Sequence, residues 1–395
     1  MKIIGIDDKE EQLRKLNRKK VVITAIISII IITFSVLICV YLFNKTFRDF
    51  IDKYVLMKNV REDNVISISL DDTESNYVFA YDKYICLFNQ NTLTAYNTSG
   101  KKEYELKIEI SNPIIDSNGR FLLIAEKQKQ KIYLISGSNI IWENELEGNI
   151  SRLSVNKNGY TSVILTGTTY KSIVEVFDNT GKELFKTYLS NSIAMDSDIS
   201  YDNKYLSFAE VSTEGTIMQS MIKTIAIPKA KENPSESIIS SITSPSDSAI
   251  INLKYQDGNK IVCMYDNAIH CIENGELKEL ISLEENQKIS FADIELNNYA
   301  FRIIEKSVLF ATDSVVELVN TSSKKVNIYS LDGIVKEVYA YNDAIALNLG
   351  SEVHFIGTNG WLIKKYISSH EVTNIVMSNN FAAVVYRNKI EIIEL

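Results

Sequence analysis

Proline, tryptophan, histidine and cysteine are all scarce in this chain of 395 residues, which contains four, two, three and four of them respectively. Three of the four prolines fall between residues 228 and 245, so most of the chain is free of the residue that interrupts sheet ladders. Tyrosine, with 21 copies, and isoleucine are abundant instead, and aromatic and β-branched residues favour strands. The balance predicts a globular protein built mainly from sheet.

The few cysteines exclude the common zinc and dithiol sites. Cys39, Cys86, Cys263 and Cys271 form no CxxC pair, and no histidine stands at a spacing that would complete a zinc site. A turn at residues 266–268 would place Cys263 and Cys271 on neighbouring strands of a hairpin, so a disulfide between them is one alternative. The other is that the cysteines beyond residue 43 are free, buried thiols.

Catalytic motifs are also missing. The sequence has neither HExxH nor GxSxG, and its SxxK match at Ser322–Lys325 falls in an expected turn rather than at a helix start. His270 and His354 stand before two similar segments, so a repeat explains them without a metal, and His370 is the third histidine. We therefore assign no catalytic, cofactor-binding or metal-binding residue, and we expect no cofactor.

One long apolar run stands apart from the globular composition. Val21–Phe43 holds 23 residues without a charge, which as a helix would extend about 34 Å and cross a bilayer core. A cleaved signal would have a shorter apolar region and a small-residue cleavage site, and Asn44 and Lys45 follow instead. Bulky residues before Cys39 also argue against a lipoprotein signal. The run predicts a transmembrane helix.

The charges flanking this run predict its orientation. Five Lys and Arg lie within residues 14–20, whereas the cations after the run are diluted by Asp49 and Asp52. The positive-inside rule places the N-terminus in the cytoplasm. Residues 1–20 carry seven basic and four acidic side chains and the whole chain carries −8, so residues 21–395 carry −11. Such an acidic domain excludes nucleic acid as a partner.

Acidic runs in this region do not form a recognisable calcium loop. Leu70–Glu74 and Ser282–Asn286 lack the alternating oxygen ligands and the turn glycine that such a loop needs. We interpret both as solvated surface charge.

After the apolar run, a second helical pattern is expected. Large apolar residues recur at helical spacing through residues 47–55. The domain organisation predicted is therefore a cytoplasmic tail at 1–20, a transmembrane helix at 21–43, a juxtamembrane stalk helix at 44–64 and an extracytoplasmic domain at 65–395.

That large domain repeats one hairpin plan. Segments with an apolar strand, a glycine turn and a charged, alternating strand occur at 95–106, 176–189, 271–283 and 355–367. Glycine supplies the positive φ of a tight hairpin turn. Gly100, Gly181, Gly275 and Gly360 are 81, 94 and 85 residues apart, which is about twice the roughly 40–45 residues of a propeller blade.

A second hairpin type, with a polar turn before a strongly apolar strand, falls between these segments and completes four-stranded blades. The blades are expected to begin near Tyr77, Pro113, Ser151, Met195, Ala249, Asn298, Ile334 and Val372. This predicts an all-β propeller of eight blades, with seven as the alternative, because residues 288–298 could be an extra strand or a misplaced first strand. The last unit has only three strands, so we expect Val65–Leu70 to pair with it and close the ring.

The apolar strand, Asp/Asn-x-x-Gly-Lys turn and outer strand at 178–184 and 97–106 resemble the quinoprotein-like (PQQ-like) β-propeller repeat. A propeller behind one N-terminal span is similar to an uncharacterised family of membrane-anchored proteins from low-GC Gram-positive bacteria, and more distantly to the eight-bladed outer-membrane assembly lipoprotein. The likeness covers residues 65–395. Quinone-dependent members carry a tryptophan docking signature and adjacent cysteines, whereas this chain has Trp142 and Trp361 and no adjacent cysteines, which places a quinone in doubt.

These features lead to one functional hypothesis and one alternative. The first is a single-pass protein of the cell membrane, with an extracytoplasmic propeller that acts as a protein-interaction scaffold for a partner in the cell envelope. The alternative is an extracytoplasmic hydrolase or lyase whose carboxylates meet in the propeller funnel, so enzyme activity stays open, although we favour its absence. The insertion at Pro228–Asp247 is expected to be a mobile surface loop with one outer strand.

Overall fold

The computed structural model describes residues 18–56, 58–61, 65–70, 77–212, 214, 219–233, 235–245, 248–283, 288–308 and 311–395. It divides into two compact units, residues 1–59 and residues 60–395. Each unit is described by itself.

The first unit is helical. Helix α2 (Arg18–Phe43) includes the whole of the apolar run, and among the described residues it is the helix that is long and apolar enough to cross a membrane. Helix α3 (Lys45–Tyr54) begins after Asn44, whose side-chain oxygen accepts a hydrogen bond from the Phe47 amide at 2.9 Å. This side chain caps the first turn of α3.

The predicted stalk helix at 44–64 is longer than the helix in the structure. Helix α3 ends at Tyr54, and β1 (Asn59–Arg61) follows as a short strand. Strand β1 pairs with β30 (Leu362–Ile367) as a fifth strand at the outer edge of one blade. The unpaired backbone groups of an edge strand attract an extended segment, and here that pairing replaces the last turns of the expected helix.

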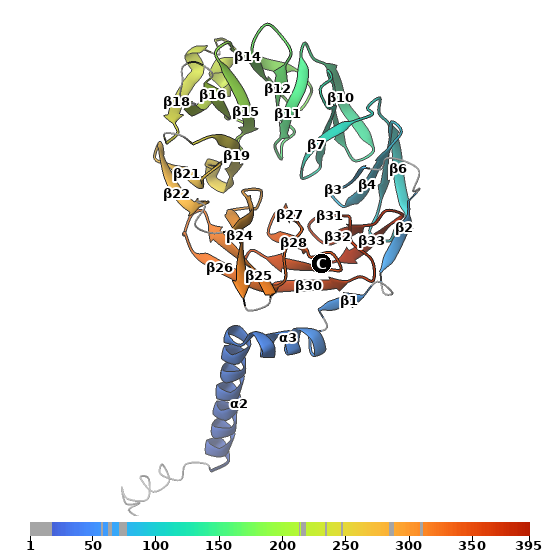
Figure 1. The fold of residues 1–395 in the computed structure, drawn as a ribbon, viewed down its shortest axis with the longest axis vertical. Coiled ribbons are helices and arrows are strands. Elements are labelled where there is room, and N and C mark those ends of the chain that lie inside the picture. The colour runs from blue at the N-terminus through green and yellow to red at the C-terminus, as the bar shows by residue number, and fades with distance from the viewer. Residues whose placement is uncertain are drawn as a thin grey trace, which may run out of the picture. The chain divides into compact units, whose positions relative to one another are not determined.

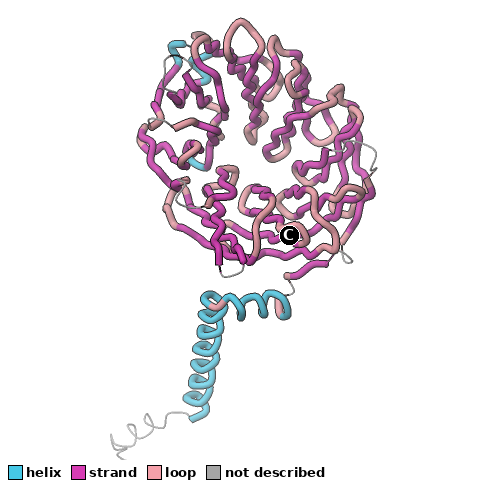
Figure 2. The backbone as a smooth tube through the Cα atoms, viewed as in Figure 1, coloured by secondary structure: helices cyan, strands magenta, loops and turns pink. Residues whose placement is uncertain are grey.

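The second unit is a closed ring of eight four-stranded antiparallel sheets (Figures 1 and 2). The first four blades are β3 (Tyr77–Tyr81), β4 (Tyr84–Asn89), β5 (Thr92–Tyr96) and β6 (Lys102–Lys107); β7 (Pro113–Asn118), β8 (Phe121–Glu126), β9 (Lys131–Ser136) and β10 (Asn139–Glu145); β11 (Asn149–Val155), β12 (Thr161–Thr166), β13 (Ser172–Phe177) and β14 (Glu183–Leu189); and β15 (Ser192–Ile199), β16 (Tyr205–Ser212), β17 (Gln219–Ala226) and β18 (Ile238–Thr243).

Blades 5 to 8 follow the same order from the axis outward. They are β19 (Ile250–Gln256), β20 (Lys260–Tyr265), β21 (Ala268–Glu273) and β22 (Glu276–Ser282); β23 (Ile289–Asp293), β24 (Tyr299–Val308), β25 (Ala311–Asn320) and β26 (Val326–Asp332); β27 (Glu337–Tyr341), β28 (Ala344–Asn348), β29 (Glu352–Gly357) and β30; and β31 (Asn374–Met377), β32 (Phe381–Val385), β33 (Lys389–Glu394) and β2 (Ile66–Ser69).

Burial explains the sequence pattern of the blades. The second strands, such as β8 and β32, are buried on both faces because neighbouring blades pack against each of them, whereas an outer strand such as β26 alternates between exposed and buried residues. One core cluster joins Leu134 and Trp142 of blade 2 to Val163 and Phe177 of blade 3. The core therefore lies between the blades rather than at the ring axis.

The ring closes as predicted. Strand β2 pairs antiparallel with β33, with Ile66 opposite Ile392 and Ile68 opposite Ile390. The N-terminal strand of the propeller thus supplies the fourth strand of the last blade, and blade 8 has no unpaired outer edge at β33.

Eight blades are confirmed, and the alternative of seven is wrong. One predicted boundary is also wrong. Blade 6 begins with β23 (Ile289–Asp293) rather than at Asn298, which lies in the turn before β24. The boundary differs because β23 has only five residues, whereas β24 has ten and gives the stronger strand pattern. The four repeat glycines each have φ between 75° and 81°, as a tight hairpin turn requires.

The described part of the insertion at Pro228–Asp247 contains short helical segments as well as the predicted outer strand. Helix α4 (Ile227–Ala230) and the turn η2 (Ser235–Ser237) precede β18, which is the predicted outer strand. Ile227 and Ala230 are buried in one cluster with Phe185 and Leu189 of blade 3. The described part of the insertion therefore seals the rim between blades 3 and 4.

A disulfide between Cys263 and Cys271 is excluded by strand register. Cys263 pairs with His270, and Cys271 pairs with Val262. Paired residues share a face and successive residues alternate, so the two cysteines point to opposite faces of blade 5. Both are free, buried thiols, as in the second alternative.

Candidate functional site

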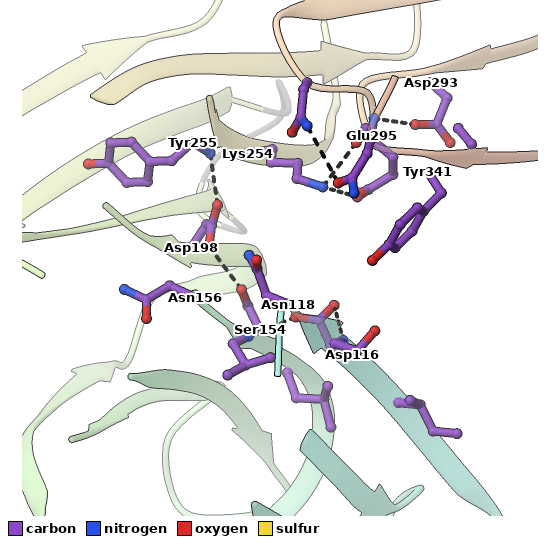
Figure 3. Close-up of a pocket in the computed structure, with 18 of the residues that line it drawn as sticks. Asp116, Asn118, Ser154, Asn156, Asp198, Lys254, Tyr255, Asp293, Glu295 and Tyr341 are labelled. Carbon is purple, nitrogen blue, oxygen red and sulfur yellow. Dashed lines mark hydrogen bonds and ion pairs between the residues drawn. The ribbon is translucent and has the colours of Figure 1, made fainter. Parts of the chain in front are cut away.

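The first strands of the blades enclose a funnel-shaped cavity of about 620 Å³. Residues from all eight blades line it, from Ala80 in blade 1 to Asn379 after the first strand of blade 8. Figure 3 shows the part of this funnel where charged side chains from several blades point toward one another. We take this cavity as the candidate functional site because side chains from all eight blades meet in it.

Charge in the funnel is uneven. Its lining holds five carboxylates and one cation, Lys254 of β19. The carboxylates come from blades 2, 4 and 6: Asp116 on β7, Asp196 and Asp198 on β15, Asp293 on β23, and Glu295 just after β23. The described lining therefore carries a net negative charge when these groups are ionised.

Three of the carboxylates bind the backbone of the next blade. Asp116 accepts a hydrogen bond from the Val155 amide at 2.7 Å, and Asp198 accepts one from the Tyr255 amide at 2.8 Å. Asp196 accepts a third from the Leu253 amide at 3.0 Å. These bonds link blade 2 to blade 3 and blade 4 to blade 5. The aspartates therefore hold neighbouring first strands together and also give the funnel its negative charge.

Asp198 is held most firmly. Its second carboxylate oxygen accepts hydrogen bonds from the Ser154 hydroxyl at 2.9 Å and from the Ile199 amide at 2.8 Å. The hydroxyl and the two amides are neutral donors, so they hold the carboxylate in place without cancelling its charge.

Lys254 forms the one ion pair of this wall. Its ammonium group donates to the Glu295 carboxylate and, at 3.2 Å, to the Glu295 main-chain carbonyl. The Glu295 amide in turn donates to Asp293 at 2.5 Å. Lys254 therefore neutralises one carboxylate directly and leaves the aspartates with neutral donors.

Burial raises the pKa of the funnel aspartates. It raises the pKa of Asp116 to about 6, that of Asp196 to about 7 and that of Asp293 to about 6, with Asp198 and Glu295 adding repulsion. The pKa of Asp198 is also raised by burial. Burial alone would lower the pKa of the Lys254 ammonium, but the Glu295 charge raises it overall, so the lysine stays protonated.

Another wall of the funnel is uncharged and largely apolar and aromatic. Blades 1 and 7 supply to the lining one phenylalanine, two alanines, a valine, two tyrosines and the polar Asn342, and none of these is charged: Phe79, Ala80, Val338, Tyr339, Ala340, Tyr341 and Asn342. Burial raises the pKa of Tyr339 to about 12, so its hydroxyl stays neutral. A ligand in this cavity would meet carboxylates on one side and aromatic rings on the other.

The chemistry of this arrangement favours binding of a positive group. Among the described residues, no set of three or more His, Cys, Asp or Glu side chains is placed to hold a metal ion. The funnel carboxylates that the backbone holds can attract a cation electrostatically, and the aromatic wall can add cation–π contact.

The histidines of the sequence lie outside the funnel lining. His354 accepts or donates a hydrogen bond at 2.9 Å to the Tyr329 hydroxyl between blades 6 and 7, and His270 lies edge-on to Tyr265 within blade 5. Trp142 is buried between blades 2 and 3, and Trp361 is exposed on blade 7. These residues act in blade packing, apart from the exposed Trp361.

The remaining sequence motifs give no site. Ser322–Lys325 lies at the turn between β25 and β26, as expected, where the Ser322 and Ser323 amides and the Ser323 hydroxyl donate to the Asn320 side chain. Residues 71–74 and 284–286 of the two acidic runs lie outside the described residues.

Sequence reasoning missed the funnel carboxylates, although a signal was present. Asp116 and Asp198 occupy equivalent positions, since each accepts the amide of the matching residue in the next blade. Aligning the first strands by phase would have shown carboxylates recurring in the strand nearest the axis.

Comparison with known proteins adds the following. A model described as a family of unknown function (DUF5711) matches residues 56–395. A search of the curated proteins found no significant match. Among solved structures, BamB from Moraxella catarrhalis is similar over 84% of this chain and 99% of its own, at 11% identity and a TM-score of 0.48.

Two further solved structures are similar. Apo AztD from Citrobacter koseri matches over 77% of this chain and 96% of its own, at 10% identity and a TM-score of 0.45. Hsv2 from Kluyveromyces lactis matches over 71% and 93%, at 9% identity and a TM-score of 0.45. The quinoprotein-like repeat and the low-GC Gram-positive origin stay expectations from the sequence.

Proposed function

We propose, for a chain that belongs to the DUF5711 family of unknown function, that it is a membrane-tethered scaffold of the cell envelope whose funnel receives a positively charged segment of a partner protein. Helix α2 supplies the anchor, and the propeller supplies a rigid binding platform. The family description gives no activity, so the proposal depends on the geometry of the funnel.

One observation carries it: the funnel aspartates are fixed by neutral donors and their charge is not cancelled. Asp116 and Asp196 bind backbone amides, and Lys254 pairs with Glu295 instead. Burial of these aspartates costs free energy, as their raised pKa values indicate. A Lys or Arg side chain placed in the funnel would offset that cost, because an opposite charge stabilises the ionised carboxylates.

The size of the funnel sets the size of its occupant. About 620 Å³ is within the range of small-ligand cavities and admits a few side chains rather than a folded domain. The partner would therefore present a loop or a terminal segment.

The envelope location and outward orientation are part of the proposal. The cations at residues 14–20 support an N-terminus in the cytoplasm, which places the propeller outside the membrane.

Copurification from native membranes tests this function. The full chain should retain a specific envelope protein at about 50 mM salt and release it at about 500 mM, because screening weakens the charged contact. Asp196→Asn/Asp293→Asn, which keeps acceptor oxygens but removes two charges, should lose the same protein, whereas Ile239→Ala on the exposed outer strand β18 should keep it. Equal retention by all three proteins would contradict the proposal.

A hydrolase or lyase remains the second candidate, and the raised pKa values favour it specifically. Carboxyl groups titrating at about 6 to 7 on separate blades are suited to general acid or base catalysis near neutral pH. Turnover of a cell-wall glycan or peptide that is abolished by one funnel Asp→Asn substitution would establish this candidate and replace the scaffold proposal.

A further inference from the structure

A second charged site lies on the outer rim, away from the funnel. It is one face of β14, the edge strand of blade 3, and we call it the β14 face. Tyr188 on β14 and Tyr170 in the loop between β12 and β13 contact each other with ring centroids 4.7 Å apart and planes tilted by 43°, and they are 48% and 38% exposed. Helix α4 packs on the other face of β14 through Phe185 and Leu189, so it leaves this tyrosine pair uncovered.

Three carboxylates surround one lysine beside the tyrosines. Lys186 Nζ lies 3.2 Å from Glu175, 3.3 Å from Glu147 and 3.3 Å from Glu183. Glu147 and Glu183 have side chains 45% and 48% exposed, whereas the Glu175 side chain is 3% exposed. With all four groups charged, the cluster carries a net charge of −2.

Glu175 gives an independent indication that this cluster lacks a hydrogen-bond donor. Its second carboxylate oxygen, Oε2, is buried and has no hydrogen-bond partner among the described residues. A buried acceptor without a donor is costly, and burial together with the neighbouring Glu183 and Glu147 charges raises the pKa of Glu175 to about 7 despite Lys186. One lysine is insufficient for three carboxylates.

An added cation would correct this imbalance. A positive group between Glu147 and Glu183 would bind the two exposed carboxylates. Lys186 could then pair with the Glu175 carboxylate alone. Guanidinium fits better than ammonium, because its planar fork binds carboxylates through paired N–H groups and its face stacks on aromatic rings. The exposed tyrosine pair provides the ring surface, and tyrosine and arginine recur at the centres of protein interfaces.

We propose that the β14 face binds an arginine side chain presented by a basic segment of a partner protein. The charge of the cluster and the uncovered tyrosine pair select this occupant. A metal ion is the poorer fit, since Lys186 occupies the space between the carboxylates. This site is independent of the funnel, which is built from the first strands of the blades.

Titration of the full chain in nanodiscs with a labelled acetyl-Ser-Arg-Ser-Arg-Ser-amide peptide tests the proposal. The matched peptides replace each arginine by lysine or by uncharged citrulline. We expect the arginine peptide to bind roughly fivefold more tightly than the lysine peptide, and the citrulline peptide not to bind measurably.

Variants locate the binding. Tyr188→Ala and Glu147→Gln should each weaken the arginine peptide roughly fivefold. Tyr188→Phe should retain the affinity, because the ring is preserved and the fold is little altered. Ile239→Ala, which truncates an equally exposed residue on β18, is the matched control and should change nothing.

Three results would overturn the proposal. They are an arginine peptide that fails to bind, equal affinities for the arginine and lysine peptides, and binding that survives both Tyr188→Ala and Glu147→Gln unchanged. A peptide that binds in the funnel instead would keep its affinity in both Tyr188→Ala and Glu147→Gln, which is the third result.

Discussion

The two walls of the funnel share one scaffold but differ in chemistry. Blades 2 to 6 contribute five carboxylates and Lys254, whereas blades 1 and 7 contribute alanine, valine and aromatic side chains. Both walls are first strands of blades with the same antiparallel pairing. The difference indicates that the fold accepts either charged or uncharged residues at the axis. The charged residues are therefore not required by the fold, and a role in binding can explain them.

The charged wall does structural work that the aromatic wall does not. Asp198 joins three blades, because it accepts hydrogen bonds from Ser154 of blade 3 and from Tyr255 of blade 5. The first predictions separate this structural role from the electrostatic one.

Asp198→Leu should have the largest effect on stability. It leaves the Tyr255 and Ile199 amides and the Ser154 hydroxyl without their acceptor, at a cost of about 2–3 kcal/mol in the free energy of unfolding. Asp198→Asn keeps an acceptor oxygen for Ser154 and Ile199 but places an NH2 group against the Tyr255 amide, so it should cost about half as much, roughly 1–1.5 kcal/mol. Chemical denaturation of the full chain measures both, and equal losses for the two variants would show that the charge rather than the acceptor matters.

Lys254→Met should have the next largest effect. It removes the cation that pairs with Glu295 and should cost about 1–2 kcal/mol, because a partly buried carboxylate is left unpaired. The pKa values of Asp116 and Asp293 should rise further, since Lys254 lowers both. Carboxyl titration by NMR measures this rise, and unchanged pKa values would show that solvent screens the lysine from the aspartates.

Stability should also depend on pH through the charged wall. The native pKa values of Asp116, Asp196 and Asp293, about 6 to 7, exceed the value of about 3.9 for an unfolded aspartate. At a pH between the unfolded value and the native values, the native state therefore binds more protons than the unfolded state. The free energy of unfolding should therefore rise as pH falls from about 8 to about 5, by roughly 1–3 kcal/mol for each aspartate. The gain is complete below the unfolded pKa and is lost as pH rises through the native values.

Glu175 on the β14 face contributes a pH dependence of the same sign, because its pKa is also raised. The share of Asp116 and Asp196 is the part that disappears in Asp116→Asn/Asp196→Asn, and Asp293 keeps its own share. If this double variant keeps the full pH slope in urea denaturation, the funnel aspartates are not the source.

The smallest effect is expected on the aromatic wall. Tyr341→Phe keeps the ring and removes a hydroxyl that hydrogen-bonds Ser378 and Asn342, so it should cost about 0.5 kcal/mol. It should leave the pH dependence of stability unchanged. A loss as large as that of Asp198→Leu would remove the distinction between the walls.

The sequence predicted the ring but not the site. Glycine turns at Gly181 and Gly275 and the missing strand of the last unit were visible as pattern, because hairpin turns and edge pairing depend on local sequence. The boundary of blade 6 was misplaced because β23 has five residues, whereas the next strand, β24, has ten and gives the stronger strand pattern.

The funnel itself depends on contacts between distant residues. Asp196 meets Leu253 across 57 positions of sequence, and Lys254 meets Glu295 across 41. The sequence predicted the number of blades and the approximate start of each one, but bringing these residues together needs the exact register of each first strand, which the sequence did not give. The β14 face was missed for a related reason, since Glu147 reaches Lys186 from the neighbouring blade linker.

The most direct test of the account is photocrosslinking from inside the funnel in native membranes. A photoreactive phenylalanine analogue replaces Tyr341, which lines the funnel on blade 7, and the control analogue replaces Ile239 on β18. We expect one envelope protein to crosslink from position 341, not from 239, and to be lost when Asp116→Asn/Asp196→Asn is introduced alongside. A crosslink that persists at full yield without these two charges, or the absence of any crosslink from position 341, would contradict the claim that the charged wall binds a partner.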